Sequence, residues 1–377
     1  MIVRRLQLRS VRNHQSTELV LGEQVNALVG NNGQGKTNLL EALSYLSLTK
    51  SFFGATDRTV LKHGASSFEI TGEVEDKGGR VHAVRIVYDR ETNQKTVSVN
   101  GVRAESMASV IGRFPVVVLA PDHGKITTGS PAERRKFIDM VLSQFSRAYL
   151  DDLLEYRRVL RQRNRILLEA RADGRDPFAV LEPWTESLAR YGSRIVVRRG
   201  EFINGFVPYV REAHATLSGG MEEPALSYVS GGGASPEATP EQACRRLLEE
   251  LQRRAAEERR RGLTLVGPHR DELRLFLDGI EVQPFASQGQ HKTLLVALKI
   301  AECLYLSERS EEAPALLLDD LFGELDPVRS RRILSMVSGL GQTVITATDV
   351  ALFQDAIGWN DRNRCYAVEE GTCRHVR

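Results

Sequence analysis

The fold is decided by the stretch Gly30-Asn31-Asn32-Gly33-Gln34-Gly35-Lys36-Thr37. It satisfies the pattern G-x-x-x-x-G-K-[ST], and it lies between an apolar run, Val25–Val29, and a helical pattern over residues 37–48. In this context the glycines let backbone N–H groups turn inward and cradle the β- and γ-phosphates of a nucleotide, while the helix N-terminus adds a positive dipole end. Lys36 would add a fixed charge beside the phosphates, and the Thr37 hydroxyl would ligate Mg²⁺. The stretch therefore predicts a site for ATP and Mg²⁺.

A second part of this site lies far along the chain. Residues 315–318 are apolar, and Asp319 and Asp320 follow them directly. A buried strand that ends in a carboxylate places it at the carboxyl edge of a parallel sheet, where open α/β folds bind ligands. We expect Asp319 on the Mg²⁺ side and Asp320 to be the catalytic base for the attacking water. About 280 residues separate the two parts, which fits the head of an ABC-type ATPase better than a small GTPase or a nucleotide kinase.

A third element precedes the Asp pair and resembles the S-G-G-Q signature of ABC ATPases. It reads Ser287-Gln288-Gly289-Gln290, and a helical pattern follows over residues 293–306. In ABC ATPases this signature reaches the γ-phosphate held by a second copy, so the resemblance implies an ATP-dependent homodimer. A polar helix cap would give the same four residues. Glu324-Leu325-Asp326 stands at the place of the D-loop, which crosses towards the partner's site in such dimers.

The remaining pattern predicts an α/β fold whose head is split by a helical insertion. The head combines a mixed sheet with an antiparallel β subdomain, because residues 66–99 alternate like paired strands and Asn100-Gly101 marks a tight turn. Strand character also returns at residues 263–266. We expect a Gly/Ser/Pro-rich loop near 218–240 and long helices over 131–171, 183–217 and 240–261. The predicted domains are an N-terminal part of the ATPase head over 1–120, a helical arm over 121–262, and a C-terminal part of the head over 263–377.

Composition narrows the class of protein further. The formal net charge is only +2, so any nucleic-acid surface must be local. The cysteines are scattered, without a close pair at metal-ligand spacing, and are expected to be reduced packing thiols: Cys244, Cys303, Cys365 and Cys373. No signal peptide begins at the N-terminus, and no apolar run approaches the roughly 20 residues that span a bilayer. We therefore expect a soluble, cytoplasmic protein without a membrane partner.

Five segments in order along the chain resemble motifs of the RecF family of bacterial recombination-repair proteins. Arg12-Asn13-His14 is similar to F-R-N-Y, with Val11 in place of Phe. The others are Gly129-Ser130-Pro131-Ala132-Glu133-Arg134-Arg135-Lys136-Phe137-Ile138-Asp139, Gly267-Pro268-His269-Arg270-Asp271-Glu272-Leu273, Ala286 to Gln290, and Leu317 to Asp326. The chain departs from the family pattern at Phe53, where Arg is expected, at Lys292, also an Arg position, and at Gly323, where Ser precedes Glu-Leu-Asp.

The resemblance implies a function in recombinational repair and replication-fork maintenance, within the SOS response. Members of this family are weak, DNA-dependent ATPases that form ATP-dependent dimers on double-stranded DNA near single-strand gaps. They act with RecR and RecO and help to load RecA, and the resemblance places them at the nucleoid.

The helical arm offers the densest local basic surface. From Arg134 to Arg171 there are ten basic residues and five acidic ones. The expected DNA contacts are Arg134, Arg135, Arg157, Arg158, Arg161 and Arg165. Because aromatic residues are not interleaved with these arginines, the pattern favours the duplex backbone over single strands. A solvated helix face would give the same charge run.

Two other functions fit parts of the pattern. The nucleotide-binding subunit of a transporter would carry a switch His after residues 344–346, where this chain has threonines, and a Q-loop glutamine, where Asp122-His123 stands. A non-catalytic, ATP-gated scaffold would need the phosphate loop but no hydrolysis. For His269-Arg270-Asp271 one interpretation is a structural Arg270–Asp271 ion pair, and the other is a role in coupling the ATP site to the arm.

Overall fold

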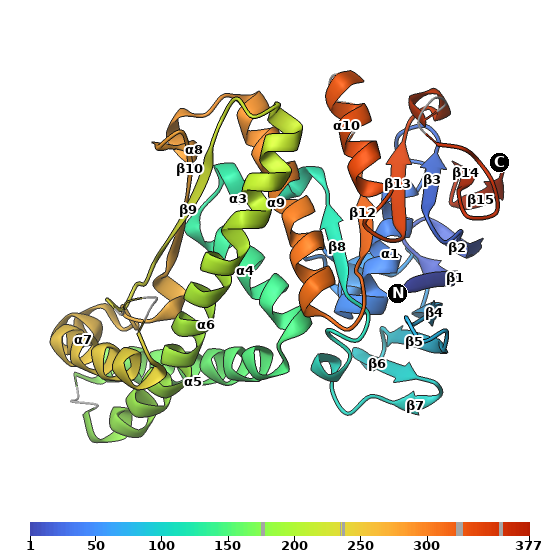
Figure 1. Ribbon diagram of the computed structural model, residues 1–377. Coiled ribbons are helices and arrows are strands. Elements are labelled where there is room, and N and C mark those ends of the chain that lie inside the picture. The colour runs from blue at the N-terminus through green and yellow to red at the C-terminus, as the bar shows by residue number, and fades with distance from the viewer. Residues whose placement is uncertain (175–177, 234, 236–237, 322–326, 354–356) are drawn as a thin grey trace. The chain divides into compact units, whose positions relative to one another are not determined.

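The computed structural model describes residues 1–174, 178–233, 235, 238–321, 327–353 and 357–377 (Figure 1). The chain divides into two compact units. The first contains residues 1–124, 215–220 and 295–377, and the second contains residues 125–214 and 221–294. Residues 263–294 thus lie in the second unit, whereas the sequence pattern groups them with the ATPase head.

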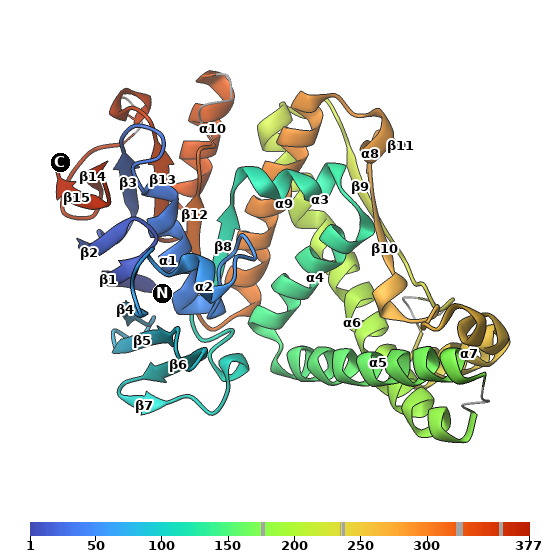
Figure 2. The ribbon, with the colours of Figure 1, turned by 180° about the vertical axis from the view of Figure 1, so that it is seen from behind.

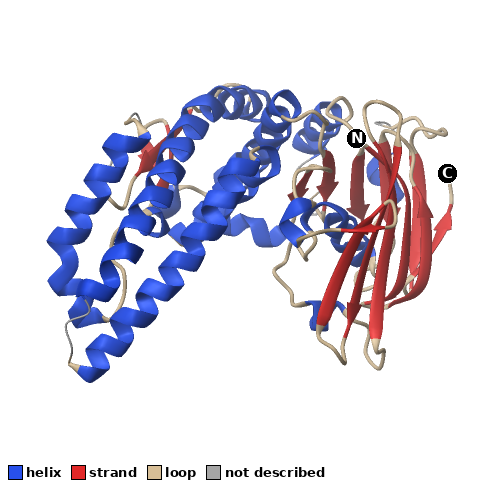
Figure 3. Ribbon diagram, turned by 90° about the horizontal axis from the view of Figure 1, so that it is seen from below, coloured by secondary structure: helices blue, strands red, loops and turns tan. Residues whose placement is uncertain are grey.

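The first unit is built on two six-stranded sheets (Figure 3). One is antiparallel, in the order β2 (His14–Val20), β1 (Ile2–Val11), β4 (Ser67–Glu75), β5 (Val81–Asp89), β6 (Gln94–Val99), β7 (Val102–Arg103). Inward and outward residues alternate along β4, as half-buried strands require. The predicted turn between β6 and β7 is present, with positive φ at Asn100 (52°) and Gly101 (78°).

The second sheet carries the predicted phosphate-loop strand at its centre. Its order is β15 (Thr372–His375), β14 (Arg364–Glu369), β3 (Val25–Val29), β13 (Thr343–Ala347), β12 (Ala315–Leu318), β8 (Val116–Leu119). All neighbours are parallel except β14 and β15. The apolar strands β12 and β8 are buried along their whole length, which is why they read as unbroken hydrophobic runs. The predicted α/β head with a mixed sheet and an antiparallel subdomain is confirmed.

Helix α1 (Lys36–Leu48) contacts strands of both sheets, which Figure 2 shows from behind. Leu39, Leu40 and Leu46 are all buried. The helix approaches β4 closely at Gly72, where an added Cβ would lie 2.3 Å from Leu46 Cδ1. A side chain at this position would force Leu46 to repack between the helix and the antiparallel sheet.

The second unit is mainly helical (Figure 3). Its long helices are α4 (Pro131–Phe145), α5 (Arg147–Asp173), α7 (Pro240–Arg261) and α6 (Phe178–Ser218), whose last residues belong to the first unit. A small antiparallel sheet joins β11 (Ile280–Glu281), β10 (Glu272–Leu277) and β9 (Pro224–Val229). Helix α9 (Gln288–Arg309) begins in this unit. Among the described residues, the shorter helices are α2 (Asp57–Val60), α3 (Lys125–Thr128), α8 (Val282–Phe285) and α10 (Pro327–Val337). The 3-10 turns there are η1 (Met107–Ser109), η2 (Pro121–Gly124), η3 (Pro268–Arg270) and η5 (Val350–Phe353).

Two local predictions are wrong. The segment expected to be a loop near 218–240 contains β9, which pairs with β10. Residues 263–266 form no strand, because side chains and not a neighbouring strand satisfy their backbone. Asn164 Oδ1 accepts from Thr264 N at 2.7 Å, and Glu258 Oε1 accepts from Leu265 N at 2.7 Å.

All four cysteines are free, as expected for reduced thiols. Within the described residues, the search for a helix with the length and apolar character of a membrane span finds none.

Candidate nucleotide site

The phosphate loop leaves the carboxyl end of β3, and two of its glycines are required by close backbone or side-chain neighbours. A Cβ at Gly30 would lie 2.3 Å from Val368 O, and a Cβ at Gly35 would lie 2.6 Å from Asn13 Oδ1. Gly35 also has φ of +109°, a conformation that L side chains rarely adopt. The glycines of the sequence pattern therefore serve both the curvature of the loop and its close packing.

The Lys36 side chain folds back over the loop. Its Nζ donates to Gly30 O at 2.5 Å and to Asn31 O at 2.8 Å. Burial lowers the pKa of this amine, while the charges of Asp320 and Asp319 oppose that shift. The ammonium group is thus held at the loop between main-chain carbonyls and two carboxylates, where it can meet the phosphates of a nucleotide.

Asp319 lies at the carboxyl end of β12 and is 5% exposed. Its Oδ1 accepts hydrogen bonds from two hydroxyls, Thr37 Oγ1 at 2.8 Å and Thr346 Oγ1 at 2.9 Å. Burial raises the pKa of this carboxyl group, and the two hydroxyls act in the opposite direction. The structure thus brings together Thr37 and Asp319, the two residues predicted to face Mg²⁺.

Asp320 occupies the turn after β12, with a left-handed φ of 47°. Its backbone N–H donates to Thr346 Oγ1 at 2.8 Å. Its side chain lines a cavity of about 130 Å³, together with Thr346 and residues of the loop and α1: Asn32, Gly33, Gly35, Lys36, Thr37 and Asn38. Thr346 therefore binds the carboxylate of Asp319 and the backbone of Asp320. The sequence places a threonine at the end of this strand but does not reveal its role.

The side chain and backbone of Gln34 form a clasp: they accept hydrogen bonds from residues near both ends of the chain. Asn13 Nδ2 donates to Gln34 O at 3.0 Å, and Gly371 N donates to the same oxygen at 3.0 Å. Glu370 N donates to Gln34 Oε1 at 2.6 Å. His14 is buried, and its Nε2 donates to Gly35 O at 3.1 Å. These residues hold the phosphate loop in place by hydrogen bonds to Gln34 and Gly35. The sequence analysis did not assign this role to the Arg12-Asn13-His14 segment.

Arg12, from the same segment, anchors α1. Its guanidinium makes a bidentate pair with Glu41, at 2.8 and 2.9 Å, and Glu41 is fully buried. The Ser51 hydroxyl donates to the same carboxylate. A buried carboxylate that is satisfied in this way fixes the orientation of the helix that follows the loop.

The signature segment forms the N-terminus of α9. Ser287 Oγ accepts from Gln290 N at 3.2 Å, and Gln290 Oε1 accepts from Ser287 N at 2.7 Å, which is a capping box. Gln290 Nε2 also donates to Glu222 Oε1 at 2.9 Å. The segment is therefore a polar helix cap in its own chain. Because Ser287 Oγ accepts the capping bond, its hydrogen is left to be donated elsewhere.

Other predicted positions of the ATPase are less informative. The D-loop residues Glu324, Leu325 and Asp326 lie outside the described residues. At the Q-loop place, His123 Nδ1 accepts from Ala120 N at 3.2 Å and caps the turn after β8.

The six arginines predicted to contact DNA occupy different environments. Arg134 is buried, and it donates to Glu272 and to Gly129 O at 2.8 Å each. It therefore stabilises the interior of the second unit. Arg135 is half-buried. Four of them, on α5, are exposed: Arg157, Arg158, Arg161 and Arg165. Arg163, in the same basic run, is buried against Glu258 at 2.7 Å.

The predicted Arg270–Asp271 ion pair is wrong. Asp271 is buried and pairs with Arg199 at 2.7 Å, and it also accepts from the Tyr228 hydroxyl. Arg270 instead donates to Thr264 O at 3.3 Å. Adjacent residues at the end of the η3 turn point apart, so the partner of Asp271 comes from α6, far away in the sequence.

Known proteins give the same assignment as this geometry. Residues 2–373 match the family model described as the RecF/RecN/SMC N terminal domain. The DNA replication and repair protein RecF of Salinibacter ruber is 41% identical over 95% of this chain and 87% of its own length. RecF of Chlorobium phaeovibrioides is 38% identical over 93% of this chain and 94% of its own. A solved structure of the recombination mediator protein RecF with ATP, from the RecFOR pathway, superimposes with a TM-score of 0.92 at 28% identity, covering 100% of this chain and 98% of its own. With its phosphate loop, its hydroxyl-held Asp319 and these matches over nearly the whole length, the chain belongs to the RecF family.

Proposed function

We propose that this protein is an ATP-dependent, double-stranded DNA-binding protein of recombinational repair, in which ATP binding drives dimerisation and slow hydrolysis drives release. The observation that carries the proposal is the contact between Thr37 and Asp319, beside a complete phosphate loop, in a chain of the RecF family. We assign the ATPase head to the first compact unit and the helical arm to the second. A protein of the same family, the recombination mediator protein RecF, has been solved with ATP.

The residues present fit Mg²⁺. Thr37 and Asp319 offer a hydroxyl and a carboxylate oxygen 2.8 Å apart, and hard oxygen donors are what this ion prefers. When bound, Mg²⁺ would neutralise charge that develops on the β- and γ-phosphate oxygens. Asp319 and Thr37 would hold it, and Lys36 would bind the same phosphates. The two hydroxyls on Asp319 fix the direction of its oxygen towards Thr37.

Asp320 is the proposed catalytic base. Its side chain lines the cavity beside the loop, and the bond from its backbone to Thr346 fixes its Cα. An aspartate is one methylene shorter than the glutamate that many ABC heads use, which fits a slow reaction. General-base catalysis contributes about 10²- to 10⁴-fold to a rate.

Dimerisation follows from the signature segment. Ser287 at the N-terminus of α9 would donate to the γ-phosphate bound by the second copy, with the positive end of the helix behind it. Gln288 and Gly289 would present their backbone N–H groups there, and Gln290 holds the cap. The D-loop residues Glu324, Leu325 and Asp326 are proposed to cross to the same site. Each nucleotide thereby becomes part of the interface, which couples ATP binding to association.

The exposed face of α5 is the proposed contact with the DNA backbone. It presents Arg157, Arg158, Arg161 and Arg165. Arg134 is buried and is therefore no longer proposed as a DNA contact. Phosphate contacts of this kind are independent of base sequence and weaken steeply with salt. By its family, the protein acts near single-strand gaps, with RecR and RecO, to help load the RecA recombinase.

Light scattering tests the proposal directly. The mass of the wild type is measured without nucleotide, with ADP and with ATP and Mg²⁺. We expect ATP alone to convert a monomer to a dimer. Lys36→Met and Ser287→Arg should remain monomeric, because one loses the phosphate ligand and the other blocks the interface. Lys77→Met, which changes an exposed lysine of the same unit, should behave as the wild type.

Asp320→Asn belongs in the same measurement. It should bind ATP and remain dimeric for longer, while its hydrolysis falls by about 10²- to 10⁴-fold. If the wild-type mass never changes with ATP, the signature does not act across an interface, and a monomeric phosphate-loop ATPase replaces the dimer. Unchanged turnover in Asp320→Asn would remove Asp320 from the role of base.

A further inference from the structure

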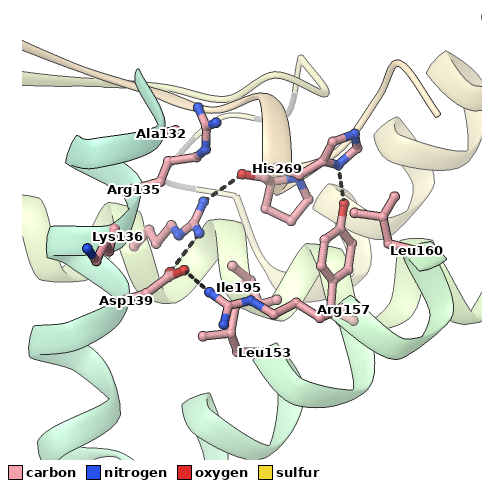
Figure 4. Close-up of a pocket in the computed structure, with 12 residues that line it drawn as sticks. Ala132, Arg135, Lys136, Asp139, Leu153, Arg157, Leu160, Ile195 and His269 are labelled. Carbon is pink, nitrogen blue, oxygen red and sulfur yellow. Dashed lines mark hydrogen bonds and ion pairs between the residues drawn. The ribbon is translucent and has the colours of Figure 1, made fainter. Parts of the chain in front are cut away.

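Two of the segments that mark the family, and that the ATPase cycle does not use, meet at a pocket in the second unit. The pocket has a volume of about 250 Å³ and lies among α4, α5, α6 and the η3 turn (Figure 4). Arg135, Lys136 and Asp139 come from the segment 129–139, and Pro268 and His269 come from the segment 267–273. The convergence of both segments on one solvent-accessible pocket points to a shared role there.

The lining is strongly positive. It contains four cationic side chains, Arg135, Lys136, Arg157 and Arg199, and one carboxylate, Asp139. His269 is neutral at physiological pH, because burial lowers its pKa to about 4.

Both oxygens of Asp139 are already engaged. Oδ1 accepts from the Tyr149 hydroxyl at 2.6 Å and from Arg199 at 2.7 Å, and Oδ2 accepts from Arg157 at 2.9 Å. Arg199 is itself buried and is paired with Asp271 as well. Asp139 therefore pairs with Arg157 and Arg199 in the wall of the pocket and forms no direct ion pair with the two remaining cations.

Arg135 and Lys136 are these remaining cations. Arg135 donates to the main-chain oxygen of Asp271 at 2.7 Å, but no described carboxylate lies within ion-pair distance of its guanidinium. Burial and the neighbouring charge of Arg199 lower the pKa of Arg135, and the charges of nearby carboxylates oppose this shift only in part. Lys136 is exposed, and the described residues form no ion pair with it. An anion beside Arg135 would offset the cost of burying its charge, and the exposed Lys136 would add a further positive charge at the rim of the pocket.

The geometry favours a phosphate group as that anion. Guanidinium groups match phosphate oxygens with paired hydrogen bonds, and an ammonium adds a point charge. The volume is several times the roughly 30 Å³ of one water molecule, so a tetrahedral anion fits. Arg157 lines the pocket and also begins the exposed row Arg157, Arg161, Arg165 on α5. Successive members of this row are about 6 Å apart along the helix, so further phosphates of a backbone can follow it.

We propose that this pocket binds one phosphate group through Arg135 and Lys136, and that its source is the backbone of duplex DNA. The proposal rests on the DNA-binding part of the function above but not on dimerisation. Free phosphate, or a small phosphate-bearing molecule, is the other source of the same chemistry.

The test measures binding of a fluorescent DNA duplex by anisotropy, with a saturating, slowly hydrolysed ATP analogue so that the phosphate loop is filled. The variants are Arg135→Gln and Lys136→Gln. Arg246→Gln is the matched control, since it removes one charge from an exposed arginine of the same unit, whose ion-pair partner among the described residues is Glu249. Loss of a charged hydrogen bond predicts an affinity about ten- to a hundredfold lower for Arg135→Gln, and a similar but smaller loss for Lys136→Gln. Arg246→Gln should change affinity less than about twofold.

The salt dependence identifies the contact as a phosphate. Each neutralised phosphate contributes about −0.9 to the slope of log affinity against log salt, so Arg135→Gln should make the slope shallower by about one. Inorganic phosphate should compete with the duplex more than chloride does at equal ionic strength, and Arg135→Gln should abolish the difference. Should Arg135→Gln fail to fold, Lys136→Gln decides, because Lys136 is exposed and supports no packing.

The outcomes separate the sources. If both variants bind duplex as Arg246→Gln does, and phosphate competes no better than chloride, the pocket is not a phosphate site. If phosphate raises the melting temperature of the wild type but not of Arg135→Gln while duplex affinity is unchanged, the pocket binds a small phosphate-bearing ligand and the DNA source is wrong. If the wild type does not dimerise with ATP, the proposed ATPase cycle is wrong, but the proposal that the pocket binds phosphate is unaffected.

Discussion

A buried carboxylate at the nucleotide site of the first unit and two buried carboxylates of the second unit are held by different partners. In the first unit, Asp319 is held by the hydroxyls of Thr37 and Thr346. In the second unit, Asp139 and Asp271 are both held by the guanidinium of the buried Arg199.

The difference separates a site that binds a cation from a site that maintains structure. A hydroxyl orients a carboxylate but leaves its negative charge in place, so Asp319 can still attract a metal ion. A guanidinium neutralises the charge, and the cost of desolvating both ions is repaid only while the pair is intact. Asp139 and Asp271 can therefore attract no further cation, and the cations around them are free to bind an anion.

The largest effect is expected when the guanidinium of Arg199 is removed. Arg199→Met would remove the guanidinium partner of the buried Asp271 and leave Arg157 as the cation beside Asp139, and we expect the free energy of unfolding to fall by about 3–5 kcal/mol. Urea denaturation measures it. Arg198→Met is the matched control, because Asp152, the partner of Arg198, keeps Arg194. It should cost less than about 1 kcal/mol. Equal losses in the two variants would mean that the second unit does not depend on Arg199 as a hub.

A change of pH should affect the second unit through His269. In the neutral ring Nε2 donates to Thr264 O at 3.1 Å, and Nδ1 accepts from the Tyr156 hydroxyl at 2.6 Å. Burial lowers the folded pKa to about 4 from the ordinary 6.5. The stabilisation is complete above pH 6.5 and is lost as the pH falls towards 4, because only the unfolded chain takes up the proton. The loss approaches about 3 kcal/mol.

Unfolding curves between pH 7.5 and 4.5 check this expectation. His269→Gln keeps a donor for Thr264 O and cannot titrate, so its stability should fall less steeply with acid than that of the wild type. Parallel curves for the two proteins would show that His269 is not the group responsible.

The smallest effect is expected where one of two hydroxyls is removed. Thr346→Val preserves shape but deletes the bond to Asp319 and the acceptor for Asp320 N–H. Because Thr37 still holds Asp319, we expect a loss of stability of about 1–2 kcal/mol. Hydrolysis, measured as phosphate release at saturating ATP, should fall about tenfold. Thr348→Val, at an exposed position beyond the same strand, is the control. A Thr346→Val enzyme with full activity would show that Thr37 alone positions Asp319.

The sequence predicted the parts of the site that are formed by residues adjacent in the chain. The phosphate loop, its strand and its helix are continuous, and the apolar run before Asp319 could only be a buried strand. Thr346 was visible as a threonine at a strand end, but its bond to Asp319 arises only when β12 and β13 pair. Local pattern thus determines the elements, and pairing of the strands determines the partners.

The second unit was predicted less well for the same reason. Nothing near Arg199 distinguishes it from Arg198, yet one is a buried hub and the other is half-buried beside Asp152. Arg134 and Arg163 were counted as basic surface, although each is buried and pairs with a carboxylate more than 90 residues away in the sequence. Charge in a helical sequence does not reveal which face is covered, because the covering element comes from elsewhere in the chain.

The clasp on Gln34 has a consequence for how the protein is made. A ribosome synthesises the phosphate loop early, but Glu370 and Gly371, which grip it, are made 336 or more residues later. Strand β14, which flanks the loop strand, is also among the last parts to appear. Such distant contacts close slowly. A nascent chain therefore carries the complete phosphate-loop sequence long before it can hold the loop in shape, and we expect stable ATP binding only after Glu370 and Gly371 have been made.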